Sequence, residues 1–241
     1  MVQGPVLLVV VRHAESIRNQ VKKDTVYFAD DAARRVVRGT PDHLIDLTEA
    51  GWEQARQTGH AIRDRFGTFD FVYTSGYART EQTARGLLAA YPDEERAQIP
   101  VLTNLFIRER DSGYGYDMTE AEAESAFPWL AEYWQTFGPF FSRPPGGESI
   151  ADLATRVDTF LVMLAREHAG RRVLMVTHGG TIRCLRFLIE GIAYEKFPEV
   201  FRADPPANCG VTTYQPGPTG LLQLEEYNRV YWTVGSSEDG Q

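Results

Sequence analysis

Three short stretches of the sequence place histidine or arginine at the end of an apolar run or shortly after it. Arg12 and His13 follow the aliphatic run Val6 to Val11, Arg79 follows a second run, and His178 follows a third. An imidazole can act as a nucleophile or carry a proton, and a planar guanidinium fork binds oxyanions well. If the chain brings these stretches together, two histidines and two arginines share one crevice. The residues therefore predict a site that binds an anion and handles protons.

The elements that must position these residues are predicted from the apolar patterns. Continuous apolar runs predict strands buried on both faces, and apolar residues spaced by three and four predict helices between them. The predicted strands are Val6 to Val11, Phe69 to Tyr73, Arg172 to Val176, Val211 to Tyr214 and Leu221 to Glu225. The predicted helices begin after Thr48, near Ala78 (through about Ala90), after Ser149 and after His178 (through about Glu190).

This alternation of strands and helices predicts an α/β fold. We expect a three-layer sandwich with a mostly parallel central sheet and helices on both faces. Because ligands of such sheets gather at the carboxyl ends of the strands, the polar residues that follow the strands should meet at one edge.

Composition excludes several classes of protein. The 241 residues are 43% hydrophobic and 12% aromatic, which argues against disorder and favours a globular protein. No apolar run reaches the roughly 20 residues of a membrane span, and none resembles a secretory signal. The net charge of −8 argues against a nucleic-acid surface. Two cysteines are too few for a disulfide scaffold and lack zinc spacing, so we expect a cytoplasmic protein.

We expect one domain over residues 1–241, with two lid-like segments at about 19–46 and 111–147. Both segments follow residues of the predicted site and interrupt the alternation of strands and helices. The stretch from Asp111 to Ser142 is rich in aromatic and acidic residues and contains no Lys or Arg. If it covers the site, a second anionic group on a substrate would find few partners there. This composition favours a ligand whose remainder, beyond the bound anion, is neutral or aromatic, unless the aromatic residues only pack helices together.

Several motifs resemble those of one known family, the histidine phosphatase superfamily with its phosphoglycerate-mutase-like fold. The stretch Arg12-His13-Ala14-Glu15-Ser16 resembles the Arg-His-Gly/Ala-Glu signature of this family. Further similar stretches are Leu47-Thr48 with Gly51 and Gln54-Ala55, Tyr73 to Ala84, Glu109 with Gly113, Pro145 to Ser149, and Val176 to Gly180. The stretches Pro41-Asp42-His43 and Ile107 to Asp111 look like a broad-specificity phosphatase branch of the family.

The resemblance implies a metal-independent phosphatase that hydrolyses small phosphate monoesters through a phosphohistidine, without a cofactor. It implies that His13 is the nucleophile, that Glu109 is the proton donor and that His178 assists. The phosphate ligands would be Arg12, Asn19, Arg79 and Gly179. Arg18 and Ser16 are further candidates for substrate contact. Positive charge from the arginines should keep His13 unprotonated.

Three alternatives remain open at this stage. The chain could be a phosphotransfer mutase on the same scaffold, or a module that binds a phosphorylated ligand without turning it over. It could also be a metal hydrolase that uses His13 and His178, although no short metal-ligand pair occurs in the sequence. The expected partner is a small phosphorylated metabolite rather than a nucleic acid or a membrane, and a homodimer is compatible with the sequence.

Overall fold

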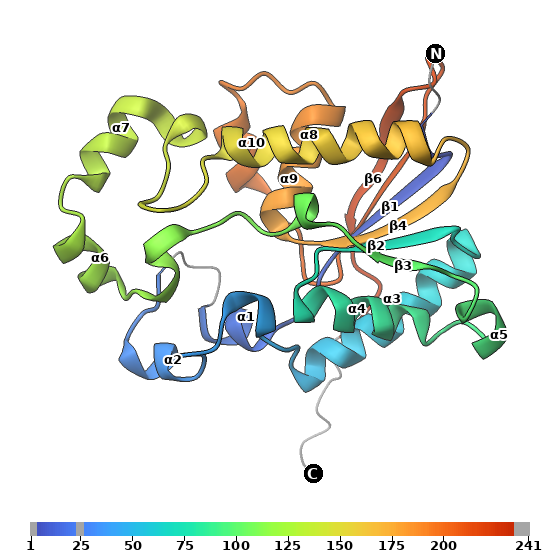
Figure 1. The fold of residues 1–241 in the computed structure, drawn as a ribbon, viewed down its shortest axis with the longest axis horizontal. Helices are drawn as coiled ribbons and strands as arrows, with labels where there is room; N and C mark the ends of the chain where they lie inside the picture. The colour runs from blue at the N-terminus through green and yellow to red at the C-terminus, as the bar shows by residue number, and fades with distance from the viewer. Residues whose placement is uncertain (1–3, 23–26, 234–241) are drawn as a thin grey trace, which may run out of the picture.

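The structure, a computed structural model, describes residues 4–22 and 27–233 (Figure 1). Its strands are β1 (Leu7–Arg12), β2 (Phe71–Thr74), β3 (Val101–Thr103), β4 (Arg172–Thr177), β5 (Val211–Pro216) and β6 (Leu222–Arg229). The first helices are α1 (Ile17–Lys22), α2 (Asp31–Arg35), α3 (Glu49–Phe66), α4 (Ala78–Leu88) and α5 (Asp93–Arg96). The later helices are α6 (Glu120–Ala126), α7 (Leu130–Phe141), α8 (Ile150–Glu167), α9 (Gly179–Ile189) and α10 (Phe197–Ala203). Three short 3-10 helices are η1 (Asp42–Leu44), η2 (Leu105–Ile107) and η3 (Gly113–Asp117).

The strands form one six-stranded sheet in the order β3-β2-β4-β1-β5-β6. The pairs β1/β4, β2/β4 and β2/β3 are parallel, whereas β5 and β6 add an antiparallel hairpin beside β1. This confirms the predicted mostly parallel sheet. Details of the strands differ from the sequence prediction: β2 covers Phe71–Thr74 rather than Phe69 to Tyr73, β6 extends to Arg229 rather than to Glu225, and β3 was not predicted. β3 has only three residues, all of them exposed, and so short a run does not mark a strand.

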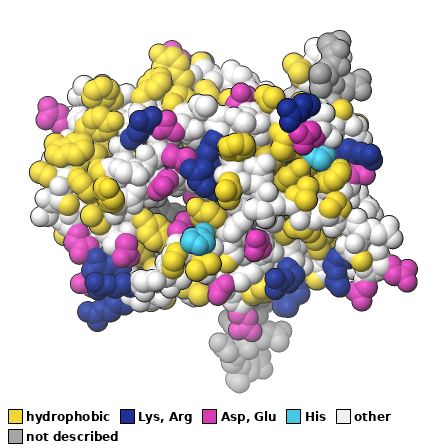
Figure 2. Space-filling model, viewed as in Figure 1, with side chains coloured by type: hydrophobic (Ala, Val, Ile, Leu, Met, Phe, Trp, Pro, Cys, Tyr) yellow, Lys and Arg dark blue, Asp and Glu magenta, His cyan; other side chains and the backbone are white. Residues whose placement is uncertain are grey.

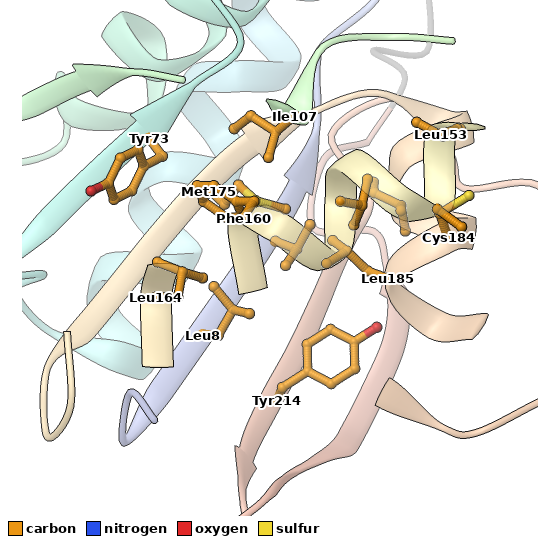
Figure 3. Close-up of a cluster of buried hydrophobic side chains, with 14 of the residues drawn as sticks. Leu8, Tyr73, Ile107, Leu153, Phe160, Leu164, Met175, Cys184, Leu185 and Tyr214 are labelled. Carbon is orange, nitrogen blue, oxygen red and sulfur yellow. The ribbon is translucent and has the colours of Figure 1, made fainter. Parts of the chain in front are cut away.

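Alternating side chains of β1 separate the core into two halves. Leu8 and Val10 pack with α8 and α9 on one face of the sheet (Figure 3), whereas Val9 and Val11 pack with α3 and α4 on the other. Figure 1 shows the same arrangement, with the sheet between the two pairs of helices. The three-layer sandwich predicted from the sequence is therefore confirmed.

The segments 19–46 and 111–147 extend from this sandwich and lie against each other. Phe28 N donates to Met118 O at 3.0 Å, and Arg34 forms an ion pair with Glu122. The aromatic residues of α7 divide between two roles. Phe140 is buried against Phe197, whereas the exposed hydrophobic side chains gather on the surface over α6 and α7 (Figure 2). The two segments form walls beside the sheet edge, and lid movement stays a prediction.

Candidate active site

A cavity of about 510 Å³ lies at the carboxyl ends of β1 and β2. Seven of the nine residues predicted for the site line it, namely Arg12, His13, Ser16, Arg18, Asn19, Arg79 and Glu109. The other lining residues are Lys22, Asp42, Tyr77, Arg110, Asp111, Ser112, Gly113 and Tyr116. The sheet thus brings together residues that lie up to about a hundred positions apart in the chain.

His13 follows the last residue of β1 and is only 3% exposed. Its Nδ1 lies 2.8 Å from Ala14 O. Because a carbonyl oxygen can only accept, Nδ1 carries the ring proton and Nε2 carries the lone pair. Burial, and then the charges of Arg79 and Arg12, hold the pKa of His13 well below its usual range. The ring is therefore neutral at neutral pH, which agrees with the expectation for a nucleophile.

Arg12 and Arg79 supply positive charge from two different elements. Arg12 ends β1 and donates through one terminal nitrogen to Pro206 O at 2.6 Å. Arg79 lies in the first turn of α4 and is 4% exposed. Both of its terminal nitrogens contact the carboxylate of Asp42, at 3.1 and 3.2 Å. Asp42 was not predicted as a site residue, although its stretch served as a family marker.

Asn19 is oriented by three hydrogen bonds to its side-chain oxygen. The Ser16 backbone N–H and Ser16 hydroxyl donate to Asn19 Oδ1 at 3.2 and 2.9 Å, and Asn208 Nδ2 donates at 3.3 Å. With Oδ1 occupied as an acceptor, the amide NH2 remains as a donor for a ligand in the cavity. Asn208 also donates to the backbone oxygen of His13 at 3.0 Å. Asn208 therefore braces the loop that carries His13, and no sequence pattern predicted it as a site residue.

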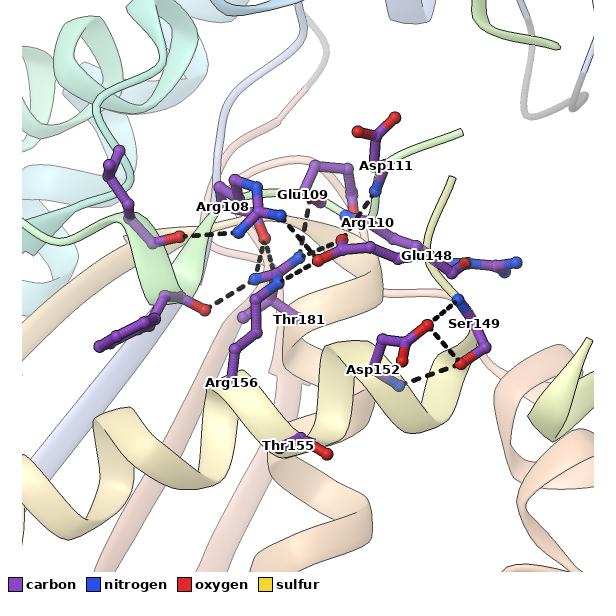
Figure 4. Close-up of polar contacts among 12 residues, drawn as sticks. Arg108, Glu109, Arg110, Asp111, Glu148, Ser149, Asp152, Thr155, Arg156 and Thr181 are labelled. Carbon is purple, nitrogen blue, oxygen red and sulfur yellow. Dashed lines mark hydrogen bonds and ion pairs between the residues drawn. The ribbon is translucent and has the colours of Figure 1, made fainter. Parts of the chain in front are cut away.

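Glu109 lies on the loop after η2, and a buried ion-pair network holds that loop (Figure 4). Arg156 donates to the backbone oxygens of Arg108 and Glu109 at 2.8 and 3.0 Å and forms an ion pair with Glu148. Arg108 also pairs with Glu148, at 2.7 Å. Within residues 4–22 and 27–233, Glu109 forms no ion pair with its neighbours Arg108 and Arg110.

The carboxylate of Glu109 fits beside α9 because residue 180 is glycine. A Cβ on Gly180 would lie 2.5 Å from Glu109 Oε1, which is too close for contact. The second glycine after His178 therefore has a steric role in the site. It leaves room for the carboxylate that the sequence predicts as the proton donor.

His178 and Gly179 do not line the cavity, unlike the other predicted residues. His178 lies behind His13, with ring centroids 5.1 Å apart, and its Nε2 is 2.8 Å from Ser75 Oγ. Burial, followed by the charges of Arg79, His13 and Arg12, holds its pKa well below the usual range. Gly179 begins α9, and a Cβ on it would lie 3.7 Å from Arg12 Nε. Both residues therefore lie directly beside residues that line the cavity.

A match to a family model identifies the family of this chain. The model of the histidine phosphatase superfamily (branch 1) matches residues 8–229. The chain belongs to the histidine phosphatase superfamily. The family assignment made from the sequence motifs is thus confirmed.

Curated relatives of this chain carry mutase names. A 2,3-bisphosphoglycerate-dependent phosphoglycerate mutase of Methylobacterium radiotolerans is 32% identical over 197 residues, which cover 80% of this chain and 84% of the relative. Phosphoglycerate mutase-like protein 4 of Arabidopsis thaliana is 30% identical over 178 residues, which cover 74% and 68%. These similarities support the superfamily and leave the specific reaction open.

Solved structures with the same fold carry phosphatase names. The alpha-ribazole phosphatase of Shigella flexneri has a TM-score of 0.71 at 21% identity, covering 95% of this chain and 98% of that chain. A mycobacterial glucosyl-3-phosphoglycerate phosphatase in complex with VO3 has a TM-score of 0.68 at 21% identity, covering 92% and 98%. At this identity they show the fold alone, and they confirm the predicted phosphoglycerate-mutase-like architecture.

The motifs that this chain shares with the superfamily brace the loop that carries His13. Thr48 caps α3 and donates to Glu15 Oε1 at 2.7 Å, and Glu15 N donates to Gln54 Oε1 at 3.0 Å. A Cβ on Gly51 would lie 2.1 Å from Glu15 O, so only glycine permits this approach. Thr83 accepts from Ala14 N at 2.9 Å. The motifs after Leu47 therefore position the loop that carries His13.

Lys22, Arg110 and Tyr116 are cavity residues that the sequence reasoning did not select. Lys22 lies four residues after Arg18 on α1, and this spacing could have indicated a shared face. Arg110 directly follows Glu109. Within residues 4–22 and 27–233, no cluster of three or more His, Cys, Asp or Glu is arranged to hold a metal ion. In the same residues, no helix has the length and apolar content to cross a membrane.

Proposed function

We propose that this chain is a phosphatase that hydrolyses phosphate monoesters through a phosphohistidine on His13. The observation that carries the proposal is the neutral imidazole of His13, with its lone pair on Nε2, in a cavity that Arg12 and Arg79 also line. Guanidinium groups offset the negative charge of a phosphoryl group, which otherwise repels a nucleophile. No metal ion takes part in this scheme.

In the first step, Nε2 of His13 attacks phosphorus and the ester P–O bond breaks. The leaving oxygen takes a proton from the Glu109 carboxyl group, which acts as the general acid. Arg12, Arg79 and the amide NH2 of Asn19 bind the phosphoryl oxygens during transfer. The product is phosphohistidine, so one difficult displacement is divided into two easier ones.

In the second step, a water molecule attacks the phosphorus and the P–N bond breaks. The Glu109 carboxylate takes a proton from this water, and inorganic phosphate leaves. His178 supports the same chemistry from behind His13. Its Nδ1 is buried without a hydrogen-bond partner in the described residues, and we expect a phosphoryl oxygen on His13 to become that partner.

A mutase is the second candidate, and the names of the curated relatives favour it. A mutase returns the phosphoryl group from the histidine to a second oxygen of the substrate, whereas a phosphatase gives it to water. The two reactions share the first step and differ in the acceptor. Product analysis therefore separates them.

The test measures phosphate release from a panel of monoesters beside isomerisation of 3-phosphoglycerate. We expect phosphate release with the purified chain, and we expect it to persist in a strong chelator. Replacing His13 by Ala should lower turnover about a thousandfold or more while melting remains cooperative. Isomerisation that outpaces phosphate release on every ester would favour the mutase. An unaffected His13→Ala variant would contradict the shared mechanism.

A further inference from the structure

Three linked hydrogen bonds connect His178 to the start of α4. His178 Nε2 lies 2.8 Å from Ser75 Oγ, and Ser75 Oγ lies 3.0 Å from Thr80 Oγ1. Thr80 Oγ1 lies 2.8 Å from Tyr77 O. The Tyr77 backbone N–H also donates to Ser75 Oγ, at 3.4 Å. Ser75, Thr80 and His178 are all fully buried, so these contacts, rather than water, satisfy the two hydroxyl groups.

The direction of each bond follows from the single proton of each hydroxyl group. Tyr77 O is a carbonyl oxygen and only accepts, so Thr80 donates to it. Thr80 has no second proton, and Ser75 therefore donates to Thr80 Oγ1. Because the proton of Ser75 is then used, His178 Nε2 must carry the ring proton and donate to Ser75 Oγ. The reverse order would leave the bond from Thr80 to Tyr77 O unmade and would hold one hydrogen bond fewer.

His13 and His178 therefore carry their ring protons on opposite nitrogens. Nδ1 of His13 donates to Ala14 O, which leaves the lone pair of His13 on Nε2. In His178, Nε2 carries the proton and the lone pair is on Nδ1. The two ring centroids are 5.1 Å apart. A lone pair suits the attack by His13, but on His178 it would repel a phosphoryl oxygen instead of binding it.

Nδ1 of His178 is buried and has no hydrogen-bond partner within residues 4–22 and 27–233. Unsatisfied polar atoms of this kind are rare in folded proteins, so this atom points to a missing ligand or proton. The titratable and charged groups around the ring, from β1, the loops after β1 and β2, α4 and α8, are Arg12, His13, Tyr77, Arg79 and Arg156. Burial and the positive charges among these groups lower the pKa of His178. An anion at His13 would oppose this effect, because opposite charge favours the protonated ring.

We propose that Ser75 and Thr80 are positioning residues that hold His178 in the Nε2–H form, so that the ring binds an anion at His13 only by taking up a proton. The Nδ1 lone pair takes one proton from solvent, Nε2 keeps its proton, and the ring gains one positive charge. Nδ1–H then donates to an oxygen of the anion. This inference rests on the proposed function, since that anion is the phosphoryl group. The positive charge of His178 then arises only when negative charge is present to be stabilised.

The ring nitrogens of His178 can be observed directly by nuclear magnetic resonance. The whole chain is labelled with nitrogen-15 in its five histidines, and His178→Gln assigns the signals of His178 by their loss. Near neutral pH we expect Nε2 of His178 to be protonated and Nδ1 to be unprotonated. The opposite pattern would overturn the role of Ser75 and Thr80. This measurement needs no ligand and no turnover, so it is independent of the phosphatase proposal.

Sulfate is the probe for the proton uptake, because it stays a dianion near neutral pH and neither brings nor takes a proton. At saturating sulfate, both ring nitrogens of His178 should be protonated. Calorimetry in buffers with different ionisation enthalpies counts the protons taken up by the chain. His178→Gln should take up about one proton fewer than the unmodified chain. A His178 ring that stays neutral at saturating sulfate would overturn the proposal.

Thr80→Val separates the positioning role from a purely structural one. Without Thr80 Oγ1 as an acceptor, Ser75 donates to His178 Nε2, and the ring proton moves to Nδ1. This variant should therefore take up about one proton fewer on binding sulfate while its affinity stays close to that of the unmodified chain. His178→Gln, by contrast, should bind sulfate about tenfold more weakly. Thr80→Ser keeps the hydroxyl group and should restore the uptake. Undiminished uptake in Thr80→Val would overturn the assignment.

Thr74→Val is the matched control, because it makes the same change at a buried neighbour of Ser75. Thr74 is 1% exposed, and its hydroxyl group has no hydrogen-bond partner in the described part of the chain. This control should keep the uptake of the unmodified chain, and a loss equal to that of Thr80→Val would overturn the proposal. If Thr80→Val does not melt cooperatively, Ser75→Ala replaces it. Without Ser75 Oγ, Nδ1–H can form without a new proton, and the uptake should again fall by about one.

Discussion

Arg79 and Asp42 form a bidentate ion pair at the wall of the active-site cavity. The two guanidinium nitrogens lie 3.1 and 3.2 Å from the two carboxylate oxygens, and the guanidinium also donates to Asp42 O at 2.7 Å. The carboxylate therefore occupies the fork that the proposed mechanism assigns to phosphoryl oxygens. A phosphate that binds this face of Arg79 must displace the carboxylate or share the guanidinium with it.

Replacing Asp42 by Asn should tighten the binding of inorganic phosphate. The substitution removes a negative charge that competes for Arg79 and repels the incoming dianion. We expect the inhibition constant of phosphate to fall about fivefold to tenfold, which is typical of removing one like charge at short range. The inhibition constant is measured from the competitive inhibition of monoester hydrolysis by inorganic phosphate. Weaker phosphate binding in Asp42→Asn would instead show that Asp42 acts mainly by positioning Arg79.

Replacing Glu109 by Gln should slow the hydrolysis of esters with poor leaving groups. The amide cannot donate the carboxyl proton, so an alkyl phosphate should lose about 10²-fold to 10³-fold in kcat. The leaving oxygen of an aryl phosphate needs less protonation when its phenol is acidic. The rate of phosphoryl transfer from such an ester to His13 should therefore fall less. Single-turnover rates for the two ester types provide the measurement. An equal loss for both types would argue against Glu109 as the general acid.

Replacing Gly180 by Ala should disturb Glu109 without changing any group that reacts. A Cβ at residue 180 would lie 2.5 Å from Glu109 Oε1, so the carboxylate must move away. We expect about a tenfold or greater loss of kcat on alkyl phosphates, because small displacements of catalytic groups are costly. Gly4→Ala is the control, since a Cβ at residue 4 would meet nothing within 4 Å. Similar kinetics for the two variants would contradict the steric role of Gly180.

Replacing Glu148 by Gln should destabilise the chain through Arg156. Glu148 pairs with both Arg108 and Arg156, and the Arg156 side chain is only 9% exposed. Removal of one member of a buried ion pair leaves the other charge unbalanced and costs about 3 kcal/mol. Urea denaturation should show this decrease in the free energy of unfolding. Arg143→Gln, which breaks the exposed ion pair with Asp152, should cost no more than about 1 kcal/mol.

Most residues of the candidate site could be predicted to lie together because several of them follow recognisable strands. His13 and Arg12 follow an aliphatic run whose burial on both faces is unambiguous, and the end of a parallel strand points to a site. Asp42 gives no such signal, because it lies on a short 3-10 helix in a polar segment and meets Arg79 only through the tertiary fold.

The substrate-facing wall was predicted less well, for a physical reason. The composition of Asp111 to Ser142 describes one contiguous stretch, whereas the wall collects side chains from several segments. Lys22 and Arg183 lie on different helices 161 positions apart, and both line a second cavity of about 540 Å³ beside the first. Local composition contains no information about such convergence, so the composition of Asp111 to Ser142 could not indicate these cations.

The buried histidines predict that the chain loses stability as the pH falls below neutrality. Burial first, and nearby arginines second, hold the pKa values of His13 and His178 well below 6.5 in the folded state. The unfolded chain takes up these protons near pH 6.5, whereas the folded chain does not. Protonation of the unfolded state therefore lowers the free energy of unfolding as the pH falls from about 6.5 toward the lower folded-state pKa values. Above pH 6.5 both states are neutral at these positions, and this stability is fully present.

Melting temperatures between pH 7.5 and pH 5.5 test this linkage. The His13→Asn and His178→Asn double variant should show a shallower decline than the unmodified chain, because neither asparagine titrates. Part of the slope should remain, since burial also lowers the pKa of His168. His60→Asn, at an exposed position of α3, serves as the control and should keep the slope of the unmodified chain. An identical pH slope in the double variant would mean that His13 and His178 are not held neutral by the fold, and the lone pair assigned to His13 would then lose its physical basis.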